Sequence, residues 1–485
     1  MVQSTRSSYA VPDTAAVLQG IAPDGGLFVD PDISSRPFDV EGCLSLSYTG
    51  MAARIFSHLL PGFAPKAEKI AAVYPSKFSV PEITPLRAVG DDYALELYHG
   101  PTSAFKDVAL SVLPLLITSA RESEHMKETI SILTATSGDT GKAALEGFHD
   151  VEGTDITVFF PDGGVSAMQK AQMVTQEGKN VRVCAVRGNF DDCQRGVKEA
   201  FALINSGKRK AEGRVFSSAN SINIGRLVPQ VTYYFSAYSQ LLAQGGIRYG
   251  DAVDFVVPTG NFGDILAGYL AKQMGLPIEK LICASNANNV LTEFIRTGVY
   301  NKRRPFLKTS SPSMDILVSS NLERLLFYAC EGDTAYVASL MKALNEDGRY
   351  TLSGKALDSI QALFHADYCT EEETASTIAH LWRDCRWLSD THSAVGFAVL
   401  EKYRNSSAFT GNPCIVLSTA SPFKFPSTVL QAIGGKACED EFETAAALSD
   451  FTGEKIPENI AGLREKPVLH TDVVDIDQLT DYALS

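Results

Sequence analysis

From Tyr93 onward the chain alternates short apolar segments with longer amphipathic ones, and this alternation restricts the possible folds more than any other feature. Short apolar runs bounded by turn residues are typical of buried strands, whereas the longer segments repeat apolar residues at helical spacing. Strands that alternate with helices form parallel sheets covered by helices. The sequence therefore predicts an α/β protein, with strands at Tyr93–Tyr98, Ile130–Thr134, Ile156–Phe160, Val181–Val186, Val253–Val257, Leu281–Ala284 and Cys414–Ser418.

The predicted strands divide the chain into three parts, as expected for 485 residues, which is more than one hydrophobic core usually supports. Residues 1–92 carry frequent Pro and Gly, and we interpret them as an N-terminal mixed α/β domain. Residues 93–129 and 215–485 are expected to form the large domain. Residues 130–214 contain three of the predicted strands with their helices, and we expect them to form a smaller, mobile α/β subdomain.

The C-terminal part of the chain has few strand signals. Beyond Ala287 the sequence is expected to be mostly helical until the strand that begins at Cys414. The acidic stretch from Asp472 to Asp481 is expected to form a surface tail, because clustered carboxylates favour solvent.

Composition and charge argue against several classes of function. A net charge of −14 disfavours a surface that binds nucleic acid or an anionic membrane, since both need clustered positive charge. The longest apolar stretch, Val108 to Ile117, is too short to span a bilayer, and Met1 to Arg6 lacks the apolar core of a secretory signal. Nine scattered cysteines without metal-ligand spacing are typical of a reduced, cytoplasmic protein. We expect a monomer or homodimer that binds a small molecule and no metal.

Lys106 lies just past the predicted strand Tyr93–Tyr98, within the segment His99–Asp107 and at the start of a helical pattern. Both burial and the positive end of the helix dipole disfavour the protonated form of such a lysine. The neutral amine that results suits a Schiff base. Because most lysines at helix ends simply extend into solvent, this interpretation needs support from other residues at the same edge of the sheet.

Ligands of open parallel sheets bind beyond the carboxyl ends of the strands, and the loop after Ile130–Thr134 has a suitable composition. Its segment Thr134–Gly141 combines hydroxyl groups and glycines at the start of a helix, so it offers donors to an anion such as a carboxylate, or else serves as an ordinary helix cap. The loop is no Walker P-loop, because Thr136 and Ala143 stand where that motif needs Gly and Ser or Thr.

Three further segments between strands and helices have unusual compositions. In Pro258–Asp264, two glycines three residues apart allow the backbone to approach a phosphate closely. In Ser218–Arg226, amide, hydroxyl and guanidinium groups form a donor set that suits a phosphate dianion. In Ser418–Pro426, a hydroxyl at a strand end can bond a ring nitrogen without carrying charge. Each segment is also compatible with an ordinary turn.

Together these segments resemble the threonine synthase family, fold-type-II enzymes that use pyridoxal 5′-phosphate. The likeness extends from Ser4–Arg6 and Leu18–Leu27 to the loop at Thr419, and its strongest matches are His99–Asp107, Thr136–Gly141, Asn220–Arg226 and Thr259–Asp264. The resemblance implies a tryptophan synthase β-like fold, with a parallel sheet in the large domain, a smaller inserted α/β subdomain and an N-terminal mixed domain.

The resemblance also implies roles for individual residues. Lys106 would hold the cofactor as a Schiff base and later carry protons. The cofactor site would include Gly260, Asn261, Phe262, Gly263, Asp264, Asp139 and Thr419, with Thr419 facing the pyridine nitrogen. The substrate's α-carboxylate would contact Thr136, Ser137 and Thr140, and its phosphate would contact Asn220, Ser221, Asn223 and Arg226.

The implied reaction converts O-phospho-L-homoserine and water to L-threonine and phosphate by γ-elimination and β-addition. Four positions depart from the family pattern. Shorter members carry asparagine where this chain has Asp139, longer members carry histidine and a smaller residue where it has Ser421 and Phe423, and a glycine is usual at Ser7. Alternatives are a lyase that forms 2-oxobutyrate from the same substrate, a dehydratase of free serine or threonine, and a catalytically inactive metabolite-binding relative.

Overall fold

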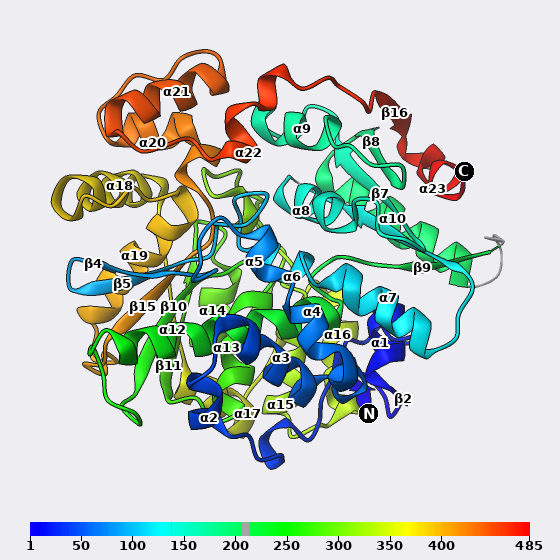
Figure 1. Cartoon of the computed structure of the whole chain (residues 1–485). Coiled ribbons are helices and arrows are strands. Elements are labelled where there is room, and N and C mark those ends of the chain that lie inside the picture. The colour runs from blue at the N-terminus through cyan, green and yellow to red at the C-terminus, as the bar shows by residue number, and fades with distance from the viewer. Residues whose placement is uncertain (137, 206–212) are drawn as a thin grey trace.

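A six-stranded sheet forms the centre of the protein (Figure 1). The computed structural model describes residues 1–136, 138–205 and 213–485. Adjacent strands of the sheet are parallel except for the antiparallel pair at one edge. In spatial order the strands are β14 (Phe364–Tyr368), β11 (Ile278–Ser285), β10 (Val253–Pro258), β15 (Cys414–Ser418), β5 (Asp92–Glu96) and β4 (Leu86–Val89).

A second sheet of five parallel strands lies beside the first, on the right in Figure 1. Its strands in spatial order are β16 (Asp472–Asp475), β8 (Val181–Arg187), β7 (Thr154–Pro161), β6 (Thr129–Ala135) and β9 (Arg214–Ser217). The helices between these strands are α8 (Asp139–Phe148), α9 (Ala167–Val174) and α10 (Phe190–Asn205).

The predicted fold class is confirmed, and each predicted strand overlaps an observed one. The central strands were recognisable because parallel strands covered on both faces are continuously apolar, as in the fully buried β10. Their carboxyl ends meet at one edge of the sheet: the Thr259 amide, just past β10, donates to the Ala284 carbonyl in β11 at 2.8 Å.

Of two expectations about the C-terminal part, the mostly helical stretch is confirmed but incomplete, and the surface tail is wrong. The stretch beyond Ala287 also contains β14, a short strand at the edge of the sheet. Because β14 directly follows α17 (Lys355–Leu363), its sequence resembles the end of that helix. The acidic stretch is not a loose tail, because β16 pairs with β8 and the following α23 (Leu479–Leu484) buries Leu479 and Ala483. Such pairing joins residues far apart in the chain, and local composition cannot reveal it.

The N-terminal residues form a small antiparallel sheet of β1 (Val2–Ser4), β2 (Ala10–Val11) and β3 (Phe28–Val29). The helices of this region are α1 (Asp13–Gln19), α2 (Val40–Leu44), α3 (Tyr48–Leu59), α4 (Ala67–Ala71) and α5 (Tyr74–Lys77). Their buried side chains belong to the same hydrophobic cluster as those of α12 (Val231–Ala243) and α13 (Gly263–Gln273). The division of the chain into three domains stays a proposal.

Further helices pack on the sheets or connect them (Figure 1). They are α6 (Lys106–Leu110), α7 (Leu113–Ser123), α11 (Ile224–Leu227), α14 (Val290–Thr297), α15 (Leu322–Ala329), α16 (Thr334–Glu346), α18 (Glu371–Cys385), α19 (Thr391–Arg404), α20 (Pro426–Ala432), α21 (Glu441–Thr452) and α22 (Glu458–Ala461). Two short 3₁₀ helices, η4 (Pro312–Met314) and η5 (Pro422–Lys424), carry residues of the site described below.

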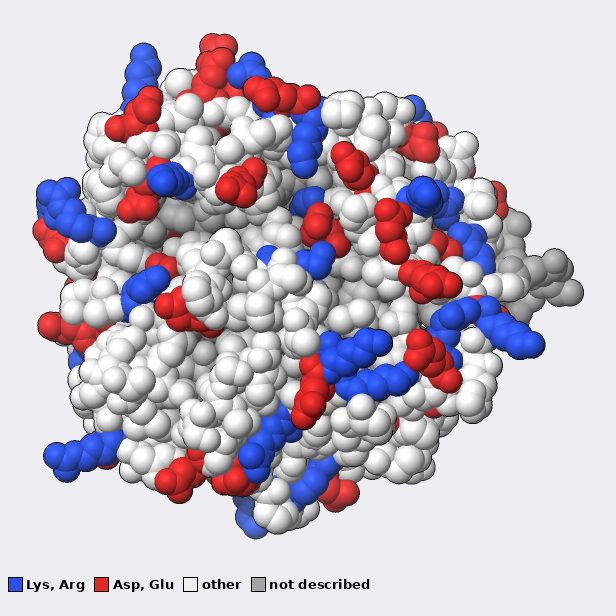
Figure 2. All heavy atoms as spheres, viewed as in Figure 1, with Lys and Arg blue, Asp and Glu red and all other residues white. Residues whose placement is uncertain are grey.

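Acidic and basic side chains are interspersed on the face shown in Figure 2. Within the described ranges, no helix is both long and apolar enough to cross a membrane. The same ranges contain no group of three or more His, Cys, Asp or Glu side chains that could hold a metal ion. All nine cysteines are free of disulfides.

Candidate active site

Lys106 is the first residue of α6 and is almost completely buried, with 8% of its surface exposed. The loop before it is held by Asp107, whose carboxylate accepts hydrogen bonds from the Thr102 amide at 2.8 Å and the Thr102 hydroxyl at 2.6 Å. Gly100 is required in this loop, because a Cβ there would lie 2.5 Å from the Asp107 Cβ. The loop therefore fixes where the Lys106 side chain begins.

The Lys106 amine lies among polar groups that come from distant parts of the chain. Its Nζ is 3.5 Å from Asp139 Oδ2 and donates to Ser313 Oγ at 3.4 Å. Burial lowers the pKa of Lys106; Asp139 opposes this shift, and the cations Lys424 and Arg226 add to it. The amine thus tends toward its neutral, nucleophilic form, as its place at the start of a buried helix predicts.

The loop before α8 brings Asp139 to this amine. Thr136 Oγ accepts hydrogen bonds from the amides of Gly138, at 3.0 Å, and Gly141, at 2.9 Å, so this hydroxyl holds the start of the helix. Gly138 has a φ of 141°, and a Cβ there would lie 2.4 Å from the Gln169 side chain. Thr140 is partly exposed. Ser137, predicted to contact the substrate, lies outside the described residues.

The segment Gly260–Asp264 forms a tight turn between β10 and α13. Gly260 is packed so closely that a Cβ would lie 2.7 Å from the Ser313 carbonyl oxygen. Phe262 has a left-handed φ of 62°, and its buried ring lies 5.7 Å from that of Phe364. The Asn261 side chain is exposed, whereas its carbonyl accepts from the Asn321 backbone and side-chain amides, both at 3.0 Å. The backbone of this turn is therefore rigidly placed.

Asp264, in the first turn of α13, has one paired oxygen and one open oxygen. Its Oδ1 accepts from the hydroxyls of Tyr233 and Tyr234, while its buried Oδ2 has no hydrogen-bond partner among the described residues. Burial raises the pKa of Asp264 to about 7, against the opposing effects of the two tyrosines and Lys106. A protonated Oδ2 could donate to an anion at the N-terminal end of α13.

Thr419 follows β15 and lies beside the Lys106 loop. Its carbonyl accepts from the Phe105 amide at 2.8 Å, and an isolated bridge pairs Ala104 with Ala420. Its side-chain hydroxyl makes no hydrogen bond to other described residues, so it is available to a ligand. These contacts place the carboxyl ends of β5 and β15 side by side.

The segment Asn220–Arg226 divides into residues with occupied and with open side chains. Asn223 is fully buried, donates to the carbonyls of Val17 and Ser218, and accepts from the Gly225 amide. Asn220 and Ser221 are partly exposed. Ser221 also lies near the turn Gly260–Asp264, since its Cβ is 3.7 Å from the position that a Cβ on Gly263 would take.

Arg226 is 5% exposed, and the only hydrogen bond of its guanidinium to the described residues runs from Nη1 to the Ala219 carbonyl at 2.8 Å. No described carboxylate lies within ion-pair distance of it. Burial lowers the pKa of Arg226 to about 10, so the group stays charged near neutrality. A buried cation with unused donors is suited to bind an anion.

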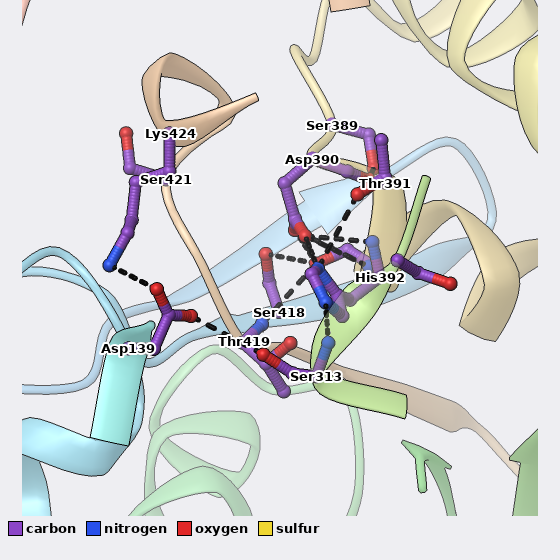
Figure 3. Close-up of polar contacts among 12 residues, drawn as sticks. Asp139, Ser313, Ser389, Asp390, Thr391, His392, Ser418, Thr419, Ser421 and Lys424 are labelled. Atoms are coloured by element: carbon purple, nitrogen blue, oxygen red, sulfur yellow. Dashed lines mark hydrogen bonds and ion pairs between the residues drawn. The ribbon is translucent and has the colours of Figure 1, made fainter. Parts of the chain in front are cut away.

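Four polar residues of the site were missed by the sequence analysis, namely Ser313, Asp390, His392 and Lys424 (Figure 3). His392 Nε2 accepts from the Ser313 amide at 3.2 Å, so its Nδ1 carries the proton and donates to Asp390 Oδ1 at 3.0 Å. Lys424 Nζ lies 2.7 Å from Asp139 Oδ1. Asp390 and His392 lie in a polar segment at the start of α19 that resembles an ordinary helix cap. The sequence therefore does not indicate that they belong to the site.

The residues present fit pyridoxal phosphate. A buried amine with a lowered pKa can bond an aldehyde, and the Thr419 hydroxyl is free to face a ring. The close-packed turn at Gly260 and the open Oδ2 of Asp264 can receive a phosphate, and the open donors of Arg226 can receive a second anion.

Comparisons with known proteins agree with this arrangement. The family model described as "Pyridoxal-phosphate dependent enzyme" matches residues 84–420, and the model "Threonine synthase, C-terminal" matches residues 393–482. The chain is 36% identical over 508 residues to the threonine synthase of Eremothecium gossypii, covering 98% of this chain and 96% of that protein.

Two further comparisons differ in coverage. The chain is similar to the crystal structure of PLP-bound threonine synthase from Brucella melitensis, with a TM-score of 0.85 and 36% identity over 100% of this chain and 98% of that one. It is also 39% identical over 435 residues to Threonine synthase-like 1 of Pongo abelii; this match covers 86% of the chain but only 57% of that longer protein.

Proposed function

The chain belongs to the threonine synthase family of pyridoxal-phosphate dependent enzymes, and from this premise we propose that it converts O-phospho-L-homoserine and water to L-threonine and phosphate. The reaction is a γ-elimination of phosphate followed by addition of water at the β carbon. The enzyme is a carbon–oxygen lyase of amino-acid biosynthesis.

Pyridoxal phosphate would supply the electron sink for this chemistry, and the protein would supply position and charge. Lys106 would bond the cofactor and then accept and return the protons of the substrate's α and β carbons. Thr419 would face the pyridine nitrogen. The turn formed by Gly260, Asn261, Phe262, Gly263 and Asp264 would hold the cofactor phosphate through its backbone amides, and Asp139 would complete the cofactor site.

The observation that carries the proposal is the buried Arg226, whose guanidinium has open donors and lies within electrostatic reach of Lys106. A substrate phosphate there would be bound together by Arg226, Asn220 and Ser221. Asn223 already bonds the surrounding backbone, so its role would be to hold this segment in place. Thr136, Ser137 and Thr140 would receive the substrate's α-carboxylate, with the Thr136 hydroxyl keeping the α8 amides in position.

We further propose that the protein works in the cytoplasm as a monomer or homodimer, with the small-molecule substrate as its partner. The nine free cysteines and the interspersed surface charges are compatible with this setting.

Product analysis tests the proposed function. Purified holoenzyme supplied with O-phospho-L-homoserine should release phosphate and threonine in equal amounts, and Arg226→Gln should lose most of this activity while keeping its fold. Absence of phosphate release from the wild-type enzyme would reject the proposal. Formation of 2-oxobutyrate without threonine would reassign the chain to the lyase reaction.

A further inference from the structure

Lys424, in η5, is a fully buried lysine that the proposed reaction does not use. Its Nζ lies 2.7 Å from Asp139 Oδ1 and donates to the Thr102 carbonyl at 3.1 Å, and its side chain has no exposed surface. A buried ammonium group is costly unless it is paired. The contact with Asp139 therefore needs a reason beyond chance packing.

Asp139 is shared between two lysines. Its Oδ1 accepts from Lys424, and its Oδ2 lies 3.4 Å from Ser313 Oγ (Figure 3). Oδ1 also accepts from the Gln169 side chain at 3.2 Å, and Oδ2 faces Lys106 at 3.5 Å. Burial alone would raise the pKa of Asp139, but Lys424 and Lys106 together hold it well below its ordinary value. The carboxylate is thus ionised, with its stronger contact on the Lys424 side.

This sharing affects the charge on Lys106. A carboxylate paired with Lys106 alone would stabilise the ammonium form by attraction. With Lys424 present, Asp139 is already neutralised, and the Lys424 cation also repels a second positive charge at Lys106. The other charged or titratable groups that act on this pair are Arg226 and Asp264 on Lys106, and His392 on Asp139.

We propose that Lys424 is a positioning residue that neutralises Asp139, so that Asp139 can orient the Lys106 amine without holding it as an ammonium ion. The three side chains come from α6, α8 and η5, and Lys424 also bonds the Thr102 carbonyl of the Lys106 loop. One buried cation therefore connects the Lys106 loop with the helix that carries Asp139.

The ion pair of Lys424 and Asp139 matters at the step in which Lys106 bonds an aldehyde. The unprotonated Nζ attacks the aldehyde carbon, a carbon–nitrogen double bond forms, and the two amine hydrogens leave with the aldehyde oxygen as water. An ammonium ion has no lone pair and cannot attack. The inference rests on the proposed function only in that Lys106 is the amine that takes up pyridoxal phosphate.

The test measures covalent uptake of pyridoxal phosphate by the apoenzyme as a function of pH, from the cofactor absorbance and from borohydride reduction with peptide mapping of Lys106. In Lys424→Met, Asp139 is left with Lys106 alone, and the pH midpoint of uptake should rise by about one unit, or roughly tenfold in rate below the midpoint. Asp139→Asn should lower the midpoint.

Two controls separate charge from folding. Lys424→Arg keeps the cation and should keep the midpoint near that of the wild type. The double variant Lys424→Met with Asp139→Asn removes both charges and should return the midpoint toward the wild-type value. Circular dichroism and thermal unfolding would confirm that each variant is folded. If Lys424→Met alone misfolds, the pH midpoint of the double variant tests the proposal.

The outcomes are distinguishable from those of the proposed function. If the wild type itself takes up no cofactor at Lys106, the proposed function fails. If the wild type is labelled at Lys106 and Lys424→Met shows the same midpoint, the positioning role of Lys424 is wrong. The same conclusion follows if the double variant keeps the shifted midpoint of Lys424→Met.

Discussion

Arg226 and Arg324 both carry buried guanidinium groups, but they differ in how many of their hydrogen-bond donors are occupied by the protein. Burial lowers the pKa of each to about 10, and neither has a described carboxylate within ion-pair distance. Arg324, in α15, donates from Nε to the Phe28 carbonyl at 2.8 Å, from Nη2 to the Ile222 carbonyl at 2.6 Å, and from Nη1 to Asn321. Within the described part of the chain, the Arg226 guanidinium donates only from Nη1, to the Ala219 carbonyl.

The difference shows that burial and a shifted pKa do not by themselves mark a binding site. At Arg324 every nitrogen is occupied, so the charge joins the N-terminal sheet, the segment before α11 and the start of α15. At Arg226 the other donors have no partner among the described residues, and the charge of the group acts on Lys106. Open donors, rather than the charge, distinguish a ligand-binding arginine from a structural one.

Removing Arg226 should produce the largest effect, and it should appear in activity. Arg226→Gln should lower kcat/KM for O-phospho-L-homoserine by roughly 10³-fold, equivalent to about 4 kcal/mol, because charged hydrogen bonds to the phosphate are lost. Steady-state kinetics measure this loss. Arg226→Lys, which keeps the charge, should lose less, and an equal loss in both variants would contradict a charge-based role.

Removing Arg324 should instead reduce stability. Arg324→Met leaves two buried carbonyl oxygens and one side-chain amide oxygen without a hydrogen-bond donor. The free energy of unfolding should therefore fall by about 3 kcal/mol. Urea unfolding followed by circular dichroism measures it. A variant that stays as stable as the wild type but loses kcat/KM would place Arg324 among the ligand-binding residues and break the comparison.

Asp264 allows the same comparison within one acidic side chain. Its Oδ1 accepts hydrogen bonds from two tyrosines, whereas its Oδ2 has no partner among the described residues. Its folded-state pKa, about 7, lies above the ordinary value of 3.8, so the stability supplied by the protonated form is complete below about pH 4 and is lost as pH rises toward 7. Asp264→Asn stays neutral throughout this window.

The stability of the cofactor-free Asp264→Asn protein relative to wild type should therefore increase by roughly 2 kcal/mol between pH 5 and pH 7. Urea unfolding at several pH values measures this difference. As a control, Tyr233→Phe removes a donor to Oδ1 and should move the upper limit of the window to higher pH. A pH-independent difference would show that Asp264 is ionised throughout.

The smallest effect is expected at Arg6, a partly exposed neighbour of the Arg324 region. Arg6 donates to Glu323 from Nε and Nη2, both at 2.8 Å, and a quarter of its side chain is exposed. Solvent screening limits such a pair, so Arg6→Gln should cost less than about 1 kcal/mol in urea unfolding. A loss as large as that of Arg324→Met would mean that the two arginines act as one unit.

Much of the fold and part of the site could be predicted from the sequence. The apolar runs identify the central strands, and the turn chemistry around Lys106, Gly260 and Arg226 identifies the loops at their ends, since both properties are local. The edge strand β14 and the C-terminal β16 were missed, because an edge strand need not be continuously apolar and its partner lies far away in the chain.

The sequence by itself determined the α/β class, the family and the lysine at the start of α6, because each depends on residues close together in the chain. The tertiary structure alone decided which polar groups are already occupied and which stay open. Thr136 and Asn223 bond the backbone around them, whereas Arg226 keeps free donors and Asp139 meets Lys424. Hydrogen-bond occupancy and charge pairing depend on distance in space, and only folding brings residues 106, 139 and 424 within a few ångströms of one another.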